Sequence, residues 1–319
     1  MGLTMQEIRL TGPDGSTASV LDWGATLRDL VVPGPGGRRR RVVLGYQRLD
    51  DYLANPSYFG AIAGRHANRI AGGRFRLDGR DHQLTLNEAG RTHLHGGIRG
   101  FSHQPWRIVA HDAASVTLAL TSPDGDQGYP GAVEARCTYT LVAPATLRIE
   151  LEAKADAATP VNLAHHSYFT LEDGADIRSH RLQIGAASYT PVDDALIPTG
   201  AVTSVAGTPY DFRAARPIDI ALDHNFVLSG DGPAAIVTSA DGRTRLTVTT
   251  DAPGLQVYDG RGVKALGPGI GGQHHFPYAG LALEPQLFPD GPNHPQFPDA
   301  ILRPGRIWRQ RSDFRVETG

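Results

Sequence analysis

Histidines that could transfer protons occur in two closely spaced pairs. The segment NLAHHSYF places His165 directly beside His166, and the segment THLHGGIRGF places His93 two residues before His95. Histidine has an ordinary pKa near ~6.5, so near neutral pH it can accept or donate a proton. Either pair could therefore contribute to general acid–base catalysis.

The residues around the first pair predict which histidine faces a polar site. The segment otherwise has the pattern of a β-strand, and adjacent strand residues point to opposite faces. Leu163 and Phe169 share a face with His165. Since these two side chains are apolar, we expect His165 to be a packed core histidine and His166 to face the polar side.

The second pair has the spacing that metal ligands can have on a strand. Two residues apart, His93 and His95 would face the same way. The following Gly96-Gly97 allows a close approach of the backbone to a ligand, or simply a turn with exposed histidines. A metal site would also need a third ligand, and no H-x-x-x-H or H-E-x-x-H motif supplies one nearby. We therefore expect no metal.

Other charged residues stand in apolar or glycine-rich surroundings. Arg65 and Arg69 lie in AGRHANRI, Asp223 lies in ALDHNF, and Glu284 follows the apolar run LAL. A buried arginine often forms a fork that holds a carboxylate or a polar ligand. Taken singly, each of these residues is more often structural than functional.

Glycine-containing turns predict two β-hairpins that would carry these residues on a β framework. Around Asp78-Gly79 and again around Asp241-Gly242, apolar residues alternate with polar ones on both sides of the turn. This combination is typical of a two-stranded antiparallel hairpin.

Alternating apolar residues predict further strands, and helices are nearly absent from the pattern. One short helix is indicated in RLDDYLAN, and no segment has helical periodicity over more than about two turns. Many short strands separated by turns are typical of a sandwich or barrel, here an unusually large one. The clearest strands span residues 115–122, 134–142 and 146–155.

Composition and charge exclude several classes of function. The 31 basic and 33 acidic residues give a net charge of −2, so nothing favours nucleic acid or an anionic membrane as a partner. The single cysteine, Cys137, fits a reducing compartment. No apolar run approaches the ~20 residues of a membrane span, and the first ten residues do not form a signal peptide. We expect a soluble, cytoplasmic protein.

Several motifs occur together and in order: GRHANRI, LHGG-x-RGF, NLAHHSYF, LIPTG, LDHNFVL, PGLQVYDG and LALEPQLFPDGPNHPQFPDAILRPG. As a set, from about residue 5 to residue 310, they resemble the aldose 1-epimerase (galactose mutarotase) family. The resemblance implies an all-β fold, a large supersandwich of mostly antiparallel strands, and we expect one domain over residues 1–319. It also implies interconversion of the α and β anomers of a free monosaccharide, without metal or organic cofactor. We expect a monomer or homodimer, and the sequence leaves the choice between them open.

The resemblance assigns roles to individual residues. It implies that Glu284 is the general base, that His166 is the general acid, in agreement with the strand argument, and that His95 is a further catalytic histidine. It also implies a set of residues that bind the sugar hydroxyls: Arg69, Asn68, Asp223 and Gln256.

Three alternatives remain open on the sequence. A hexose-6-phosphate 1-epimerase would need a cluster of basic residues aimed at the phosphate. A non-catalytic carbohydrate-binding protein could use the same fold. A metal-dependent hydrolase or lyase could use His93 and His95 with His274 or His275. The preferred aldose also stays open, because His93, His165 and the glycine- and histidine-rich segment before Glu284 depart from the family pattern.

Overall fold

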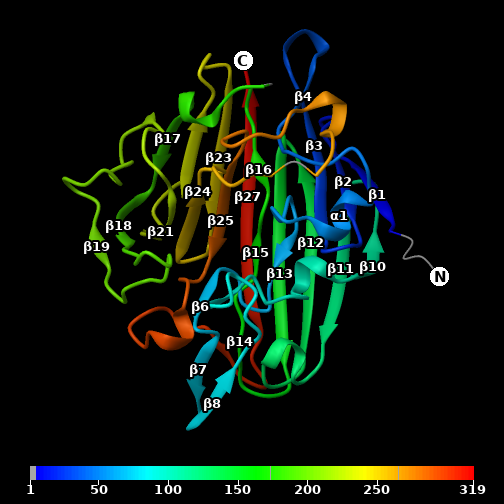
Figure 1. The fold of residues 1–319 in the computed structure, drawn as a ribbon. Helices are drawn as coiled ribbons and strands as arrows, with labels where there is room; N and C mark the ends of the chain where they lie inside the picture. Colours follow the sequence, from blue (N-terminus) through cyan, green and yellow to red (C-terminus); the bar gives the residue numbers. More distant parts are fainter. Residues whose placement is uncertain (1–4, 173, 265) are drawn as a thin grey trace.

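The computed structural model describes residues 5–172, 174–264 and 266–319 as an almost entirely antiparallel β structure (Figure 1). Residues 1–4, part of the segment for which we expect no signal peptide, lie outside the described residues. The largest sheet has nine strands, which are, in spatial order, β10 (Arg107–His111), β11 (Ser115–Ser122), β12 (Val133–Val142), β13 (Thr146–Ala155), β27 (Trp308–Thr318), β23 (Thr244–Thr250), β22 (Ala235–Thr238), β17 (Arg181–Ile184) and β20 (Arg216–Pro217).

Two further sheets complete the main layers. The six-stranded sheet is formed, in order, by β16 (Tyr168–Phe169), β25 (Leu281–Gln286), β24 (Gly254–Tyr258), β21 (Asp223–Leu228), β18 (Ala186–Thr190) and β19 (Thr203–Ser204). The four-stranded sheet is formed by β1 (Glu7–Thr11), β2 (Thr17–Leu21), β3 (Thr26–Pro33) and β4 (Arg39–Arg41).

The remaining elements are short and lie mostly in the connections. Four strand pairs are β5 (Ile62–Ala63) with β15 (Ala164–His165), β6 (Arg69–Ala71) with β9 (Thr92–Leu94), β7 (Arg74–Leu77) with β8 (Arg80–Gln83), and β14 (Thr159–Pro160) with β26 (Ile301–Leu302). The helical elements are α1 (Asp51–Ala54) and the single 3-10 turns η1 (Pro35–Gly37), η2 (Phe101–His103), η3 (Asp126–Gly128), η4 (Ile177–Ser179), η5 (Ile270–Gly272) and η6 (Gly291–Asn293).

The buried faces of the three larger sheets meet in one apolar cluster, which contains residues of every one of these sheets. Phe169 of β16 stacks on Phe314 of β27 with ring centroids 5.1 Å apart, and the Tyr139 hydroxyl of β12 donates to the Ala25 carbonyl at 2.8 Å. Packing of sheets face to face buries the alternate side chains of each strand. The predicted all-β sandwich is confirmed.

The predicted hairpins and strands are present with small differences in length. β7 and β8 pair antiparallel across Asp78-Gly79, both of which have positive φ (49° and 81°), as a two-residue hairpin turn requires. β8 ends at Gln83, so the second strand is shorter than the alternation indicated. The hairpin around Asp241-Gly242, the three alternating strands and the short helix are also found.

Residues 162–169 do not form one continuous strand, so that expectation is wrong. Ala164–His165 pairs with β5, Tyr168–Phe169 pairs with β25, and the chain crosses from one partner to the other between them. The two histidines still point to different surroundings. Among the described residues, none of the helices combines the length and the hydropathy that a membrane span requires.

Candidate active site

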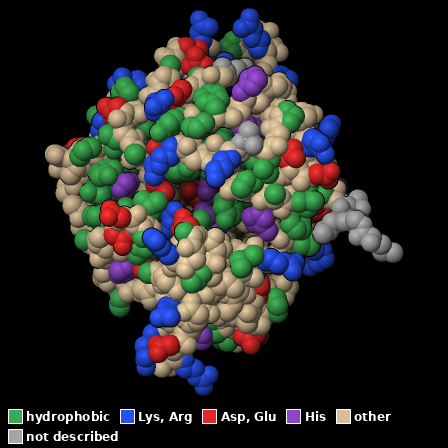
Figure 2. Space-filling view, viewed as in Figure 1, with side chains coloured by type: hydrophobic (Ala, Val, Ile, Leu, Met, Phe, Trp, Pro, Cys, Tyr) green, Lys and Arg blue, Asp and Glu red, His purple; other side chains and the backbone are tan. Residues whose placement is uncertain are grey.

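Six of the seven predicted site residues line a single cavity of about 310 Å³. Figure 2 shows a hollow near the middle of the face in view, with acidic and histidine side chains inside it. Gln256 is not among the lining residues, but its amide Nε2 donates to the Asp223 carboxylate at 2.6 Å. The six residues that line the cavity are Asn68, Arg69, His95, His166, Asp223 and Glu284.

A tight turn directs His95 into this cavity. β9 ends at Leu94, His95 has φ 50°, and Gly96 follows with φ 86°. A Cβ atom on Gly96 would lie 1.7 Å from the Gly64 carbonyl oxygen, so only glycine allows this close approach. The backbone N–H of His95 donates to the Asn68 carbonyl (3.1 Å), and the Asn68 N–H donates to His95 Nδ1 (3.2 Å).

The bond from Asn68 fixes the protonation of the His95 ring. Because Nδ1 accepts a hydrogen, the proton of the neutral ring lies on Nε2, which is then a donor. Burial lowers the pKa of His95 well below its ordinary value, and nearby His166 and Arg69 lower it further. The structure therefore presents a neutral histidine that can donate one hydrogen bond.

His166 and Glu284 lie next to each other in the lining of the cavity. His166 Nε2 lies 3.7 Å from Glu284 Oε2, and the two side chains are 5% and 3% exposed. Burial lowers the pKa of His166 to about 4. Burial and the Asp223 charge raise the pKa of Glu284 well above its ordinary value, although Arg69 opposes this effect. Burial thus favours the uncharged form of both groups, so a proton exchanged between them lies preferentially on Glu284.

The six-stranded sheet places the Glu284 and Asp223 carboxylates two residues apart in register. Gln256 of β24 lies directly opposite Glu284 of β25 and opposite Asn225 of β21, whose first residue is Asp223. Burial raises the pKa of Asp223, while Arg69, Arg261 and the bond from Gln256 lower it, and the net direction is upward.

Arg69 approaches the same carboxylate from the other side of the cavity. Its Nη1 lies 3.6 Å from Asp223 Oδ2, while its Nε and Nη2 each lie 2.8 Å from a Glu88 carboxylate oxygen. Sequence reasoning did not single out Glu88, nor the remaining polar or apolar walls of the cavity. The unpredicted lining residues with large side chains are Tyr58, Leu94, Tyr168, Leu196, Tyr258 and Arg261.

Arg65 and His165 are not among the residues that line this cavity, and their contacts are structural. The buried Arg65 donates to the carbonyl oxygens of Gly131 (2.7 Å) and Pro123 (3.1 Å) and to the Ser122 hydroxyl (2.6 Å). His165 is packed in the core, with its Nδ1 3.2 Å from the Tyr139 hydroxyl. Its predicted core position is confirmed.

His93 does not face the same way as His95, so that expectation is wrong. Its Nδ1 lies 2.7 Å from the Thr85 carbonyl, and its Nε2 lies 2.7 Å from the Tyr129 hydroxyl. The strand ends at Leu94, and the positive φ of His95 breaks the alternation on which the expectation depended.

One group of potential metal ligands is formed by the described residues, namely His95, His166 and Glu284, whose ligand atoms lie within 4.8 Å of one another. His93, His274 and His275 do not belong to it. The Asn68 N–H already occupies the Nδ1 lone pair of His95 and leaves the proton on Nε2. A nitrogen in either state has no free lone pair for a metal, so the geometry favours acid–base chemistry over metal binding.

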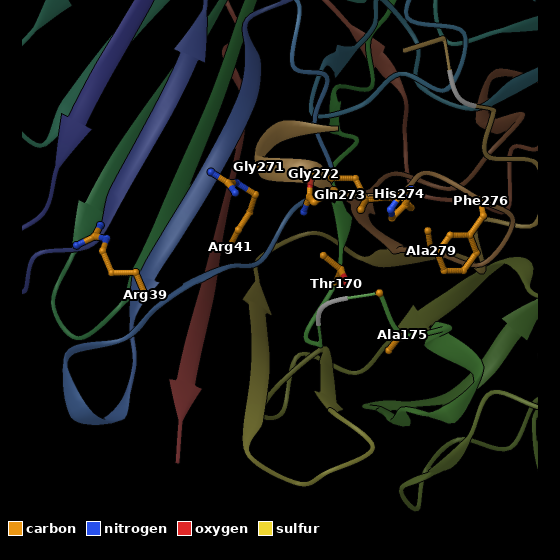
Figure 3. Close-up of a pocket in the computed structure, with 12 residues that line it drawn as sticks. Arg39, Arg41, Thr170, Ala175, Gly271, Gly272, Gln273, His274, Phe276 and Ala279 are labelled. Atoms are coloured by element: carbon orange, nitrogen blue, oxygen red, sulfur yellow. The ribbon is translucent and has the colours of Figure 1, made fainter. Parts of the chain in front are cut away.

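A second cavity, of about 270 Å³, lies beside the turn at Gly271 (Figure 3). Arg41 lies next to this turn, but its Nε and Nη2 bind the Asp29 carboxylate at 2.7 and 3.0 Å. Arg39 extends away from the other labelled residues and donates to the Gly15 carbonyl and to the Thr17 hydroxyl, both at 2.9 Å. The arginines of this cavity are therefore engaged by the protein itself.

Comparison with known proteins shows the family of this chain. The family model for aldose 1-epimerase matches residues 6–315. The chain belongs to the aldose 1-epimerase family. Galactose mutarotase from Homo sapiens is 38% identical over 332 residues, covering 98% of this chain and 94% of the relative. Aldose 1-epimerase from Escherichia coli (strain K12) is 39% identical over 320 residues, covering 94% and 92%.

Solved structures of aldose epimerases have the same fold as this chain. An aldose epimerase homologue from C. elegans superposes with a TM-score of 0.94 at 29% identity, covering 99% of both chains. Galactose 1-epimerase from Lactobacillus acidophilus superposes with a TM-score of 0.86, also at 29% identity, covering 100% of both. The family resemblance drawn from the sequence motifs is thereby confirmed.

Proposed function

We propose that the protein is an aldose 1-epimerase, an isomerase that interconverts the α and β anomers of a free aldose. The observation that carries this proposal is the adjacent pair of His166 and Glu284 in a cavity of about 310 Å³. Such a cavity has the dimensions of a small-ligand site. Together with the family membership, an adjacent acid and base in the lining of a sugar-sized cavity support reversible proton transfer at the anomeric centre.

In the proposed reaction two protons move at once. The Glu284 carboxylate accepts the proton of the anomeric hydroxyl, and the C1–O5 bond breaks as the C1 carbonyl forms. Protonated His166 donates its proton to O5. After rotation about the C1–C2 bond, the same steps run backward on the other face of the aldehyde, so no proton is gained or lost overall.

The number of protons on the pair suits this reaction. The ring-opened stage leaves Glu284 protonated and His166 neutral, which is the state that burial favours. The closed sugar requires the charged pair, which differs only in the position of one proton. With Nε2 and Oε2 3.7 Å apart, the proton can pass between the two groups with little movement, so the pair functions as a unit.

The other residues would hold the sugar while C1 rotates. His95 Nε2 is a hydrogen-bond donor suited to an oxygen of the substrate. Arg69, Asn68 and Asp223 line the cavity, and we propose that they bind hydroxyl groups. Gln256 would act through Asp223, to which it donates. Fixing the remainder of the substrate favours reaction at the one end that is free to move.

A free aldose fits this cavity better than a sugar phosphate. Arg69 is bound by Glu88 and lies near Asp223, while Arg261 lies 3.3 Å from Asp259. Each arginine that lines the cavity therefore already has a carboxylate partner. A phosphate needs donors that are not already neutralised. We further expect a cytoplasmic monomer or homodimer that needs no cofactor, membrane or nucleic acid.

The test is the approach of freshly dissolved α-D-galactose, α-D-glucose and α-D-xylose to optical equilibrium, followed by polarimetry with and without the protein. We expect acceleration for at least one aldose, and the fastest one ranks the substrates. A parallel series with glucose 6-phosphate tests the alternative epimerase. Binding without acceleration of any sugar would indicate a carbohydrate-binding protein instead.

A further inference from the structure

The Arg69 guanidinium is held from outside the cavity by a carboxylate that does not line it. Glu88 accepts from Nε through Oε2 and from Nη2 through Oε1, both at 2.8 Å. The Thr92 hydroxyl donates to Glu88 Oε2 at 2.6 Å. This side-on, two-point contact orients the planar guanidinium more firmly than a single contact would.

The arrangement leaves one nitrogen of Arg69 for the cavity. Nη1 has no contact with Glu88 and lies 3.6 Å from Asp223 Oδ2. The Arg69 side chain is 11% exposed and the Glu88 side chain 31% exposed, so Glu88 lies at the edge of the site with Arg69 farther inside. A ligand in the cavity would therefore meet Arg69 through Nη1.

The backbone ties the Glu88 loop to the strand that carries Arg69. The Thr92 N–H donates to the Glu88 carbonyl (3.3 Å), and the Glu88 N–H donates to the Thr92 carbonyl (3.2 Å). Thr92 and Leu94 of β9 lie in register with Ala71 and Arg69 of β6. The carboxylate is thus presented by a loop bonded to β9 and the guanidinium by β6, the partner of β9, which fixes the distance between them.

Electrostatics keep the pair charged. Burial raises the pKa of Glu88, but the hydrogen bonds from Arg69 and Thr92 outweigh it and leave the pKa below its ordinary value. Burial lowers the pKa of Arg69, but the bonds to Glu88 and the nearby Asp223 raise it above its ordinary value. Glu88 is ionised at neutral pH and offsets the charge of Arg69.

We propose that Glu88, supported by Thr92, is a positioning residue that fixes Arg69 so that Nη1 binds a hydroxyl of the aldose. This inference deepens the proposed function and rests on it. Glu88 touches neither the reacting atoms nor the cavity, and it acts only through Arg69. A contact made equally in the bound sugar and in the transition state lowers KM and leaves kcat nearly unchanged.

The test compares steady-state kinetics of four variants with those of the wild type. For Glu88→Ala we expect KM to rise about tenfold while kcat stays within about threefold. Glu88→Gln keeps one acceptor oxygen and should lie between Glu88→Ala and the wild type. Thr92→Val removes only the supporting hydroxyl and should have the smallest effect of the three.

The control is Glu152→Gln, which removes the carboxylate charge from an exposed arginine–glutamate pair on the nine-stranded sheet (Arg309 Nε to Glu152 Oε1, 2.7 Å). Its KM should equal that of the wild type. A merely structural role for Glu88 would lower the melting temperature and leave KM of the folded fraction unchanged. That result, or a lower kcat at constant KM, would overturn the proposal.

Crystal structures separate this inference from the proposed function. In Glu88→Ala crystals we expect the Arg69 guanidinium to leave its present orientation and to change its 3.6 Å separation from Asp223. An unmoved guanidinium would overturn the positioning role, whatever the activity. If the wild type accelerates no aldose, the proposed function fails, and the crystal comparison still decides how Arg69 is held. If Glu88→Ala does not fold, Glu88→Gln and Thr92→Val provide the same comparison.

Discussion

The nine-stranded and six-stranded sheets bury their residues in different ways. In β12 the exposed Glu134 and Arg136 alternate with buried neighbours, so one face of the strand contacts the core and the other contacts water. In β25 all six residues are buried, including Glu284 and Gln286. Strand β12 is therefore part of a scaffold with one solvent-exposed face, whereas β25 carries buried polar groups.

Buried polar groups in the six-stranded sheet need a functional explanation. Among the described residues, Glu284 Oε2 and Gln256 Oε1 have no hydrogen-bond partner. A buried polar atom without a partner destabilises the fold, and such atoms persist where they serve a ligand or a reaction. A mutation of a buried polar residue in the six-stranded sheet should therefore lower catalytic activity. A mutation of a core residue in the nine-stranded sheet should instead lower the stability of the fold.

The largest expected effect on activity comes from changing Glu284, the proposed general base. Glu284→Gln should lower kcat by about 10²- to 10⁴-fold, because an amide of the same shape cannot accept the anomeric proton. The melting temperature should not fall, because the substitution keeps the volume and removes a group whose charge burial disfavours. Polarimetry and thermal unfolding measure the two quantities.

Glu150→Gln is the matched control, because it makes the same change on an exposed position of β13. It should leave both activity and stability as they are. Retention of more than about a tenth of the wild-type kcat in Glu284→Gln would contradict the assignment of the base, since general-base catalysis contributes more than this.

The second prediction concerns the nine-stranded sheet, where we expect a mutation to lower stability and to leave activity unchanged. Leu151 of β13 is 1% exposed and belongs to the main apolar cluster. Leu151→Ala should lower the free energy of unfolding by about 2–5 kcal/mol, because it leaves a cavity in the core. kcat and KM of the folded protein should stay at wild-type values. Urea unfolding and kinetics on the same preparation test this, and a selective loss of kcat would mean that the two sheets are coupled.

Much of the scaffold could be predicted because its signals are local. Asp78-Gly79 needs only its own backbone preferences to form a turn, and the alternation in β12 repeats every two residues. The core position of His165 could also be predicted, since the apolar Leu163, two residues away, identifies the core side. These features follow from residues that are neighbours in the sequence.

The rest of the site depends on contacts between distant parts of the chain. Glu88 looks like a surface residue beside an Ala-Gly turn, and only the fold places it against Arg69. Tyr58 has φ 57°, which no alternation pattern predicts. The motifs identified Glu284 only as part of a set, because β25 is buried on both faces and has no alternation. Family resemblance supplied what periodicity could not.

A third prediction concerns the acid limb of the pH profile. Burial lowers the pKa of His166 to about 4 and raises that of Glu284. As the pH falls below about 4, His166 gains a proton while Glu284 is already protonated, so the pair contains no base. We expect kcat/KM, which reports the free enzyme, to fall about tenfold per pH unit there.

Circular dichroism at each pH distinguishes titration of the site from acid unfolding. Activity should return when the sample is brought back to neutral pH. An acid limb near the ordinary histidine pKa of ~6.5 would show that His166 is more exposed to water than the structure has it.

The smallest expected effect is at Cys137, on the core side of β12. Its side chain is buried beside Leu118 and Leu151 in the neighbouring strands, and burial raises the pKa of the thiol. Only the thiolate reacts with iodoacetamide, so the native protein should remain unmodified and fully active, whereas the protein unfolded in urea should be alkylated. Mass spectrometry measures both. Rapid alkylation of the native protein would show that the nine-stranded sheet opens to water at its core, and a sheet that opens there could not hold the six-stranded sheet in the register on which the site depends.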